Sequence, residues 1–440
     1  MQTKRLLWIV ALGLGFALTL GLLMALSPSP EVAHAWPITP GVTPSPPVTR
    51  PPGPAFVKPG GSGGWCLQND PCGSIQYAID QCEPGNGDTI YVAGGTYTGT
   101  GAAVITVTKS ITLYGGWDGS LTGEIVRNSN IHPTTLDGEN VRRVVYISKN
   151  IPPIIEGFII THGRDQEGGG IYAENATPVI AGNVITNNVA LWYGGGGYIR
   201  SGAPVITANA VLSNSAVYGG GGFSFSHGTV VLHGNHIAEN QANYGGGLHV
   251  DSASITATAN LIVHNQAISA WVTSGFEGHR LVAVNNVLAN NSGTAFEIYN
   301  YHYADLIHNT IVDNGDNAVK GAYTATIILT NNIIADHAAS SVIAWAGATV
   351  SASNNLFWNN GADPVTGTNA VLDNPLFVDP DGGDYHIGPA SAAIGQGANA
   401  GVTTDIDGDP RPAPAGTRPD LGADEIGQRR IYLPLVLRNG

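Results

Sequence analysis

The stretch NVITNN at residues 183–188 returns seven more times along this chain, and the repeat decides the fold. The further copies are NAVLSN at 209–214, NHIAEN at 235–240, NLIVHN at 260–265, NVLANN at 286–291, NTIVDN at 309–314, NIIADH at 332–337 and NLFWNN at 355–360. Their first residues lie 26, 26, 25, 26, 23, 23 and 23 positions apart. A regular period of this length is typical of a solenoid in which each repeat forms one coil.

Three columns of the aligned repeats have a physical meaning. The first residue is always asparagine, and the sixth is asparagine in every copy except the seventh, which has His337. Asparagine amides stacked about 4.8 Å apart can hydrogen-bond from coil to coil and satisfy buried turn backbone, so we interpret both columns as structural. The third residue is always apolar, which predicts an inward-facing stack of Ile185, Val211, Ile237, Ile262, Leu288, Ile311, Ile334 and Phe357.

The repeat length narrows the fold class. The leucine-rich signature is absent, and a propeller blade needs about 40 residues. Three short strands and three turns fit a coil of this length, and connections between parallel strands are right-handed. The sequence therefore predicts an all-β protein, a right-handed parallel β-helix with 23–26 residues per coil.

The flanking segments predict how the solenoid begins and ends. Short alternating runs at 87–92, 95–97 and 111–115 are expected to form the first coils. Ser74 is a suitable N-cap for a short helix with Ile75, Ala78 and Ile79 on one face, which would cover the open N-terminal end. We expect the β-helix to span residues 56–378, a C-terminal cap or anchor-associated region 379–427, and a tail 428–440.

The N-terminus carries an export signature. Lys4 and Arg5 precede an apolar run and Ala33-His34-Ala35, which predicts a signal peptide over residues 1–35 and a mature chain that starts at Trp36. A retained anchor helix is the alternative, because the apolar run is long enough to span a bilayer. Both place the folded part outside the cytoplasm, secreted or at the cell surface. Residues 36–55 are rich in proline and predict an extended linker.

Cysteine usage and charge exclude some classes of function. An exported chain with Cys66, Cys72 and Cys82 close together is expected to form one disulfide, with the pairing left open. The formal net charge is −14 without a basic cluster, so nucleic acid is not an expected partner.

Glycine runs accompany the first repeats at 168–170, 194–197, 219–222 and 245–247. One interpretation is a turn that requires positive φ, and the other is a flat surface strip that forms a ligand groove. The aromatic residues near these runs predict a row that stacks on sugar rings, or alternatively a stack that covers the turns. These residues are Tyr193, Tyr218, Tyr244 and Trp271.

Charged residues form one further column, nine positions before each leading asparagine. Its members are Glu174, Arg200, Ser226, Asp251, Glu277 and Asn300. If the register holds, Arg200 lies beside Glu174, which predicts an ion pair. Asp251 would lie beside Glu277, a spacing that could bind a cation or support acid–base chemistry.

The C-terminal residues Asp405, Asp407 and Asp409 alternate around Gly408. This pattern resembles a calcium loop, although the glutamate at the twelfth position of an EF-hand is missing. Solvated turn carboxylates are the alternative interpretation.

Several segments together resemble a known family. GDTI at 87–90, GTY at 95–97, TLDG at 135–138, GGGIY at 168–172 and the asparagine repeats resemble the right-handed parallel β-helix family of the pectate-lyase-like superfamily, over most of the mature chain. The resemblance implies the fold but no single activity, because this architecture carries lyases, hydrolases, epimerases and structural proteins. Residues 374–386, 405–409 and 419–425 look like a choice-of-anchor region, and 431–438 is similar to tails of exported proteins of filamentous green bacteria.

Two functions follow as hypotheses. The first is a monomeric, non-catalytic protein that binds a polysaccharide or cell-envelope glycan, or mediates attachment. The alternative is a polysaccharide lyase or glycoside hydrolase in which Asp251, Glu277, Arg200 and Arg280 act. The resemblance to lyases implies an arginine or lysine base and a calcium ion held by carboxylates. Cations are scarce between residues 150 and 400, where the sequence has Arg164, Arg200, Arg280 and Lys320, and this favours the first hypothesis.

Overall fold

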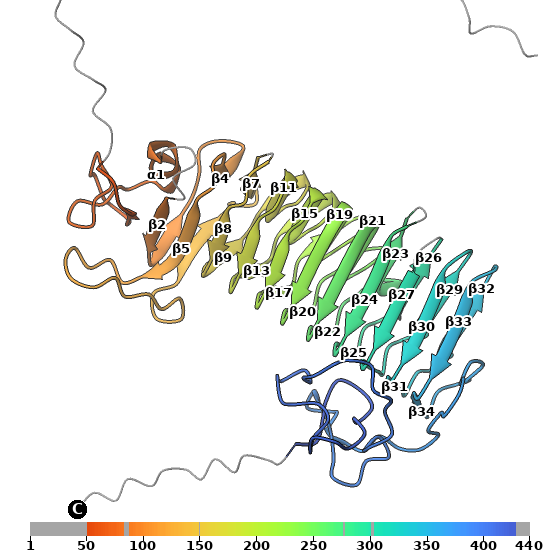
Figure 1. The fold of residues 1–440 in the computed structure, drawn as a ribbon. Coiled ribbons are helices and arrows are strands. Elements are labelled where there is room, and N and C mark those ends of the chain that lie inside the picture. The colour runs from red at the N-terminus through yellow and green to blue at the C-terminus, as the bar shows by residue number, and fades with distance from the viewer. Residues whose placement is uncertain (1–50, 83–87, 149, 276–277, 301–302, 428–440) are drawn as a thin grey trace, which may run out of the picture. The chain divides into compact units, whose positions relative to one another are not determined.

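The computed structural model describes residues 51–82, 88–148, 150–275, 278–300 and 303–427, which belong to one compact unit, Arg50–Gly440. The predicted signal peptide, most of the linker and the predicted tail lie outside the described residues. Within the described part, no helix is long and apolar enough to cross a membrane. Parallel strands stack coil upon coil along one axis, as Figure 1 shows.

Each regular coil has three strands, and equivalent strands of successive coils pair in parallel as three ladders. The first ladder consists of β4 (Ala103–Val107), β7 (Arg143–Ile147), β11 (Ile171–Ala176), β15 (Gly197–Gly202), the first half of β19 (Phe223–His233) and of β21 (Leu248–Thr258), β23 (Ser269–Ser274), β26 (Thr294–Tyr299), β29 (Val319–Ala322) and β32 (Val342–Trp345). The second consists of β1 (Ala55–Val57), β2 (Thr89–Ala93), β5 (Thr112–Trp117), β8 (Ile154–Glu156), β12 (Val179–Ala181), β16 (Val205–Thr207), the second halves of β19 and β21, β24 (Arg280–Val284), β27 (Tyr303–Ile307), β30 (Thr326–Thr330) and β33 (Thr349–Ser353).

The third ladder is a separate sheet of 11 strands among the described residues. It consists of β3 (Gly95–Tyr97), β6 (Thr134–Asp137), β9 (Phe158–Thr161), β13 (Val184–Thr186), β17 (Ala210–Leu212), β20 (His236–Ala238), β22 (Leu261–Val263), β25 (Val287–Ala289), β28 (Thr310–Val312), β31 (Ile333–Ala335) and β34 (Leu356–Trp358). A small parallel sheet beside the first coils contains β10 (Arg164–Glu167), β14 (Val189–Tyr193) and β18 (Ser215–Ala216).

The predicted repeat columns are confirmed. Ile185 pairs with Val211 across the third ladder, and all eight residues of the apolar column are at most 1% exposed. In the asparagine columns, for example, the side-chain Nδ2 of Asn183 donates to Oδ1 of Asn209 at 3.1 Å and to the carbonyl of Ile155 at 2.9 Å. The columns therefore bond each coil to the next inside the solenoid.

The early coils depart from the predicted length. Tyr97 pairs with Leu136, 39 residues further on, whereas Leu136 pairs with Ile160 after 24. The extra residues form a loop between β5 and β6, so the regular repeat begins only after this insertion.

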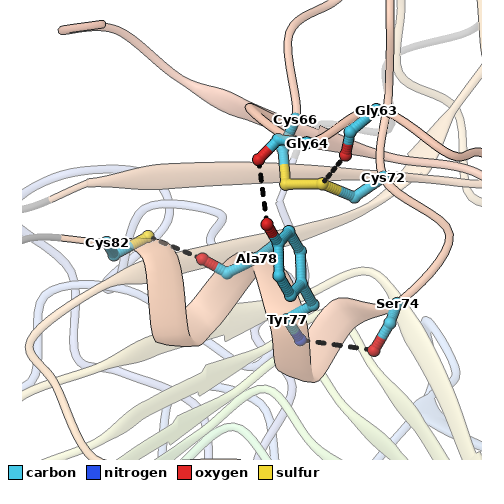
Figure 2. Close-up of a disulfide and its surroundings, with 8 residues drawn as sticks. All are labelled: Gly63, Gly64, Cys66, Cys72, Ser74, Tyr77, Ala78 and Cys82. Atoms are coloured by element: carbon cyan, nitrogen blue, oxygen red, sulfur yellow. Dashed lines mark hydrogen bonds between the residues drawn. A yellow bond between two sulfur atoms is a disulfide. The ribbon is translucent and has the colours of Figure 1, made fainter. Parts of the chain in front are cut away.

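The N-terminal cap forms as predicted (Figure 2). Helix α1 (Ile75–Gln81) starts after Ser74, whose hydroxyl accepts the N–H of Tyr77 at 3.2 Å, and its apolar face is buried. A disulfide joins Cys66 to Cys72, which settles the predicted pairing, and the buried thiol of Cys82 donates to the carbonyl of Ala78 at 3.3 Å.

The C-terminal region packs on the side of the solenoid. It contains the antiparallel pair β35 (Phe377–Asp379) and β36 (Asp384–Ile387), and Figure 1 shows it beside the strands from β25 to β34. Leu421 and Ala423 join an apolar cluster with Val312 and Ile333 of the third ladder. The buried Arg411 donates to the carbonyls of Gly422 and Ala423 and contacts Nδ1 of His308.

Candidate functional site

Three tyrosines of the first ladder point outward from successive coils. Tyr146 on β7, Tyr172 on β11 and Tyr198 on β15 pair in direct register, and their ring centroids are 5.8 Å apart at both steps. Their strand neighbours Val145 and Ile171 are buried, so the alternation of a β-strand turns the tyrosines to the outer face. We call Tyr146, Tyr172 and Tyr198 the tyrosine row.

An arginine covers the start of the tyrosine row. The guanidinium of Arg143 lies 4.5 Å from the ring centroid of Tyr172 and 5.9 Å from that of Tyr146. It is fixed from the small sheet by the carboxylate of Asp165 at 3.2 Å and by the carbonyl of Glu167 at 2.6 Å. A fixed cation over aromatic rings leaves a rigid surface with both apolar faces and hydrogen-bonding groups.

The outward column continues beyond the row with Ser224 and His249. The hydroxyl of Ser224 lies 3.1 Å from Nδ1 of His249, whose ring centroid is 5.4 Å from that of Tyr193. Burial lowers the pKa of His249, so its imidazole is neutral near pH 7. The aromatic surface therefore extends over two more coils without an added charge.

The predicted turn tyrosines Tyr193, Tyr218 and Tyr244 lie beside this surface. Tyr193 bridges to Gly219, and Gly219 bridges to Tyr244, so these positions form a column. The rings of Tyr193 and Tyr218 are 5.9 Å apart, and Tyr218 and Tyr244 are 49% and 47% exposed. The structure thus brings these three residues to the same face as the tyrosine row.

Trp271 was predicted as the fourth member of this aromatic row, and that prediction is wrong. Trp271 is fully buried, pairs with Leu248 and Phe296, and stacks in the core with its ring 5.1 Å from that of Phe296. The coil shortens here, so counting from Tyr244 reaches an inward position of β23.

The glycine runs are not an open surface strip. Gly195 and Gly196 are buried, and a β-carbon on Gly195 would lie 2.4 Å from the carbonyl oxygen of Ser215. The first glycine of each run has positive φ, as at Gly194 (+70°) and Gly220 (+68°). The turn interpretation is confirmed, and the groove interpretation is wrong because neighbouring backbone fills the space.

The charged column keeps the predicted register only in part. Glu174 pairs with Arg200, Arg200 with Ser226, and Ser226 with Asp251. The next partner of Asp251 is Ser274, and the predicted neighbour Glu277 lies outside the described residues. Strand β23 ends at Ser274, so the nine-residue offset fails where the coils change length.

Arg280 lies apart from the other predicted catalytic residues. It is on β24 of the second ladder, where its Nε donates to Oδ2 of Asp305 at 2.7 Å. Arg200, by contrast, is exposed on the first ladder, on the same strand as Tyr198. The structure therefore leaves Arg200 and Asp251 near the aromatic face and places Arg280 on a different ladder.

A charged cluster that the sequence reasoning missed lies further along the first ladder. Glu297 on β26 is 1% exposed, and Nζ of Lys320 on β29 lies 2.7 Å from its Oε1. The hydroxyl of Tyr299 donates to the same oxygen, and burial raises the pKa of Tyr299 above its ordinary value. Oε2 of Glu297 is buried without a hydrogen-bond partner among the described residues.

The predicted calcium loop has a different arrangement. Oδ1 of Asp405 accepts the N–H groups of Asp407 and Asp409 at 3.0 and 2.8 Å, and its Oδ2 accepts the N–H of Glu425. Asp405 therefore organises its own turn. Asp407 turns away to His386, with Oδ2 and Nε2 2.7 Å apart, and Asp409 is exposed, so these carboxylates do not converge.

Surface hollows occur at another corner of the solenoid. The larger cleft described here, about 450 Å³, is lined by Gly115, Arg127, Glu156, Gly157 and neighbours, next to the loop between β5 and β6. Arg127 and Glu156 form an ion pair of 3.0 Å there. The tyrosine row lies on a different ladder and forms a surface, in contrast to this cleft.

Comparisons with known proteins agree on the architecture. Residues 277–379 match the sequence model of a family described as right handed beta helix region. A comparison with curated proteins gives no match. A solved structure described as pectate lyase Pel9A is similar with 14% identity and a TM-score of 0.51, over 86% of this chain and 97% of that one. The structure of PL6 family alginate lyase AlyGC aligns with 14% identity and a TM-score of 0.33, over 72% of this chain and 53% of that one. At this level of identity the likeness concerns the fold. The chain is therefore an all-β, right-handed parallel β-helix with the architecture of the pectate lyases, as the repeat predicted.

Proposed function

We propose that the outer face of the first ladder binds a polysaccharide along the tyrosine row. The row is the observation that carries the proposal: Tyr146, Tyr172 and Tyr198 repeat at the spacing of the coils and leave ring surface on the outside. Sugar rings present apolar faces that pack on aromatic side chains, and a polymer with regular units suits a regular row. Such a surface holds a chain along the solenoid axis.

Polar groups beside the row supply the hydrogen bonds that a glycan requires. Arg143 is held over the rings, and the exposed Arg200 shares β15 with Tyr198. The carboxylates of Asp165 and Glu174 border the same surface. Because both charges are present, the test includes uronate-containing and neutral polysaccharides.

Affinity electrophoresis in gels that contain single polysaccharides tests this proposal. We expect one or more glycans to retard the protein, and Tyr172→Ala to reduce the retardation at least tenfold in apparent affinity. Tyr303→Ala is the matched control, because Tyr303 is 52% exposed on β27 of the second ladder. Equal retardation of both variants would place binding elsewhere.

A lyase is the second candidate, favoured by the cluster of Glu297, Lys320 and Tyr299 on the same ladder. The solved structure that the chain resembles over most of its length is a pectate lyase, and such chemistry requires a base beside a uronate. Lys320, once deprotonated, would take the proton next to the carboxylate. The carbon–oxygen bond to the leaving glycan would then break, a carbon–carbon double bond would form, and the leaving oxygen would gain a proton. Arg200 and Asp251 remain candidates to hold substrate carboxylate and hydroxyl groups.

Product formation separates this candidate from binding alone. The purified protein is incubated with the polysaccharides that retard it, with and without calcium, and unsaturated products are followed by ultraviolet absorbance. The lyase candidate predicts products that Lys320→Ala reduces at least a hundredfold, whereas Arg280→Ala preserves them. Retention of a glycan without any product would leave the binding function and remove the lyase.

We also propose that the protein acts outside the cytoplasm, attached to the envelope or released. The export signature at residues 1–35 supports this proposal. Amino-terminal sequencing of the exported protein should give a start at Trp36. An intact N-terminus in the membrane fraction would support the retained anchor instead.

A further inference from the structure

We propose that His386, Asp407 and Asp424 bind one first-row divalent metal ion, with zinc as the preferred ion, on the side of the solenoid. The three side chains each offer a ligand atom, and these atoms lie within 4.8 Å of one another. They come from β36, from the loop around Gly408 and from the final described loop. An ion here would join three segments of a region with little regular structure. The site differs from the polysaccharide surface and does not depend on it.

The orientation of His386 is the one that metal-binding histidines have. Its Nδ1 lies 2.5 Å from Oδ1 of Asp384, and its Nε2 faces Oδ2 of Asp407 at 2.7 Å. Ligating histidines usually donate their second ring N–H to a carboxylate, which fixes the ring and makes the other nitrogen a better ligand. Asp384 therefore acts as a positioning residue, and Nε2 is the atom available to the ion.

Asp424 is a second, independent indication of a ligand. It is 8% exposed, and its Oδ2 accepts the N–H of Ile387 at 2.8 Å. Among the described residues no donor contacts its Oδ1, so a buried carboxylate oxygen is left without a partner beside the histidine. Buried carboxylates are stable when they are paired or when they coordinate a metal ion.

The donor set indicates the kind of ion. One imidazole nitrogen with carboxylate oxygens suits zinc or manganese, whereas calcium takes oxygen ligands in larger numbers. Zinc–ligand distances of about 2.0–2.2 Å require the facing atoms to separate slightly. Asp407 can move because its side chain is 54% exposed, and water would complete the coordination.

Metal content after gel filtration tests the proposal. The purified full-length protein is stripped with a chelator, equilibrated with zinc, manganese or calcium chloride in separate arms, desalted, and analysed for metal per chain. We expect one zinc per chain in the wild type and less than a tenth of that in His386→Gln. Asp407→Asn changes an exposed side chain and should lower the zinc content similarly without disturbing the fold.

The control histidine has a carboxylate neighbour but no third ligand in the described structure. His162 lies 3.2 Å from Asp137 on the solenoid, so His162→Gln should retain the full zinc content. Zinc should also slow cleavage of the C-terminal region by a protease at least fivefold in the wild type only. Zinc content that is equal in the wild type and in Asp407→Asn would overturn the proposal, as would calcium binding that persists in His386→Gln. His386 would then hold a proton between two carboxylates.

Discussion

Each ladder amide makes several hydrogen bonds that no other side chain of its size can make together. Nδ2 of Asn240 donates to the carbonyl of Val211 at 2.9 Å and to Oδ1 of Asn265 at 3.0 Å. Its Oδ1 accepts from both the backbone N–H and Nδ2 of Asn214. The amide thus satisfies buried backbone of its own turn and of the coils on both sides, which explains why asparagine recurs there.

Asn240→Ala should destabilise the solenoid by about 3–5 kcal/mol, because it leaves the carbonyl of Val211 and the N–H of Asn214 buried without partners. Urea unfolding followed by circular dichroism measures the change. Asn243→Ala is the control, since Asn243 is exposed, and it should cost less than about 0.5 kcal/mol. Similar losses in both variants would contradict the structural role of the ladder.

His337 takes the place of an asparagine in the second amide column. Its Nδ1 lies 3.0 Å from Oδ1 of Asn360, and its Nε2 lies 3.3 Å from Nδ2 of Asn314. The neutral ring can donate to the first and accept from the second. Burial lowers the pKa of His337 to about 4, so the folded protein keeps this ring neutral while an unfolded chain protonates it at about pH 6.5.

Stability should therefore fall as the pH falls from about 6.5 to about 4, because only the unfolded chain binds the proton in this interval. His337→Asn removes this contribution, so its unfolding free energy should drop by about 2–3 kcal/mol less than that of the wild type between pH 7 and pH 4.5. Urea titrations at the two pH values measure the difference. The exposed His227→Asn should behave like the wild type, and an equal drop in His337→Asn would show that the ring is not kept neutral.

The tyrosine row could have been predicted from the sequence, whereas the charged cluster could not. Tyr146, Tyr172 and Tyr198 are 26 residues apart, so extending the repeat toward the N-terminus would have found them. Glu297 and Lys320 lie after the coils shorten from 26 to 23 residues, where a fixed offset no longer identifies the facing column. The same change explains why Trp271 and Glu277 were assigned to a face that the structure does not give them.

At the scale of the element, the glycine runs allow two coils to approach closely. Gly195 and Gly221 lie in adjacent coils, and a β-carbon on Gly195 would be 2.6 Å from the carbonyl oxygen of Gly221. The obstacles are backbone atoms, which cannot rotate away as a side chain can. The runs thereby bring the first ladder, with its outward tyrosines, next to the small sheet that carries Asp165 and Tyr193.

Gly195→Ala should destabilise the protein by about 2–4 kcal/mol, since two coils must separate to admit one methyl group. Thermal unfolding compared with Gly64→Ala provides the measurement, because a β-carbon on the exposed Gly64 meets no atom within 4 Å. An unchanged melting temperature in Gly195→Ala would show that the coils are not in close contact.

At the scale of the whole described unit, a second apolar cluster lies outside the solenoid. Val312, Ile333 and Leu356 on the third ladder pack against Tyr385 and Leu421 of the C-terminal region. The sequence predicted a cap or anchor-associated region here without its place of contact. The outward apolar residues of NTIVDN, NIIADH and NLFWNN were the available signal, because a solvated strand face would alternate with polar residues.

Leu421→Asp should detach the C-terminal region and leave the coils intact, because a carboxylate replaces a fully buried side chain in the lateral cluster. Limited proteolysis should then cleave the C-terminal region at least tenfold faster while the circular dichroism of the β-structure stays the same. Leu372→Asp is the control, since Leu372 is 66% exposed. Loss of all β-structure would instead show that the solenoid cannot fold without this region.

Calorimetric titration of the protein with a length series of oligosaccharides from the polysaccharide that retards it tests the central claim most directly. The surface from Tyr146 to His249 spans four steps between coils, or about 19 Å at about 4.8 Å per step. The account predicts that affinity rises with oligosaccharide length up to about this span and then levels off, and that Tyr172→Ala weakens the longest ligand at least tenfold. Affinity that is independent of length and equal in Tyr172→Ala would contradict a binding surface along the tyrosine row.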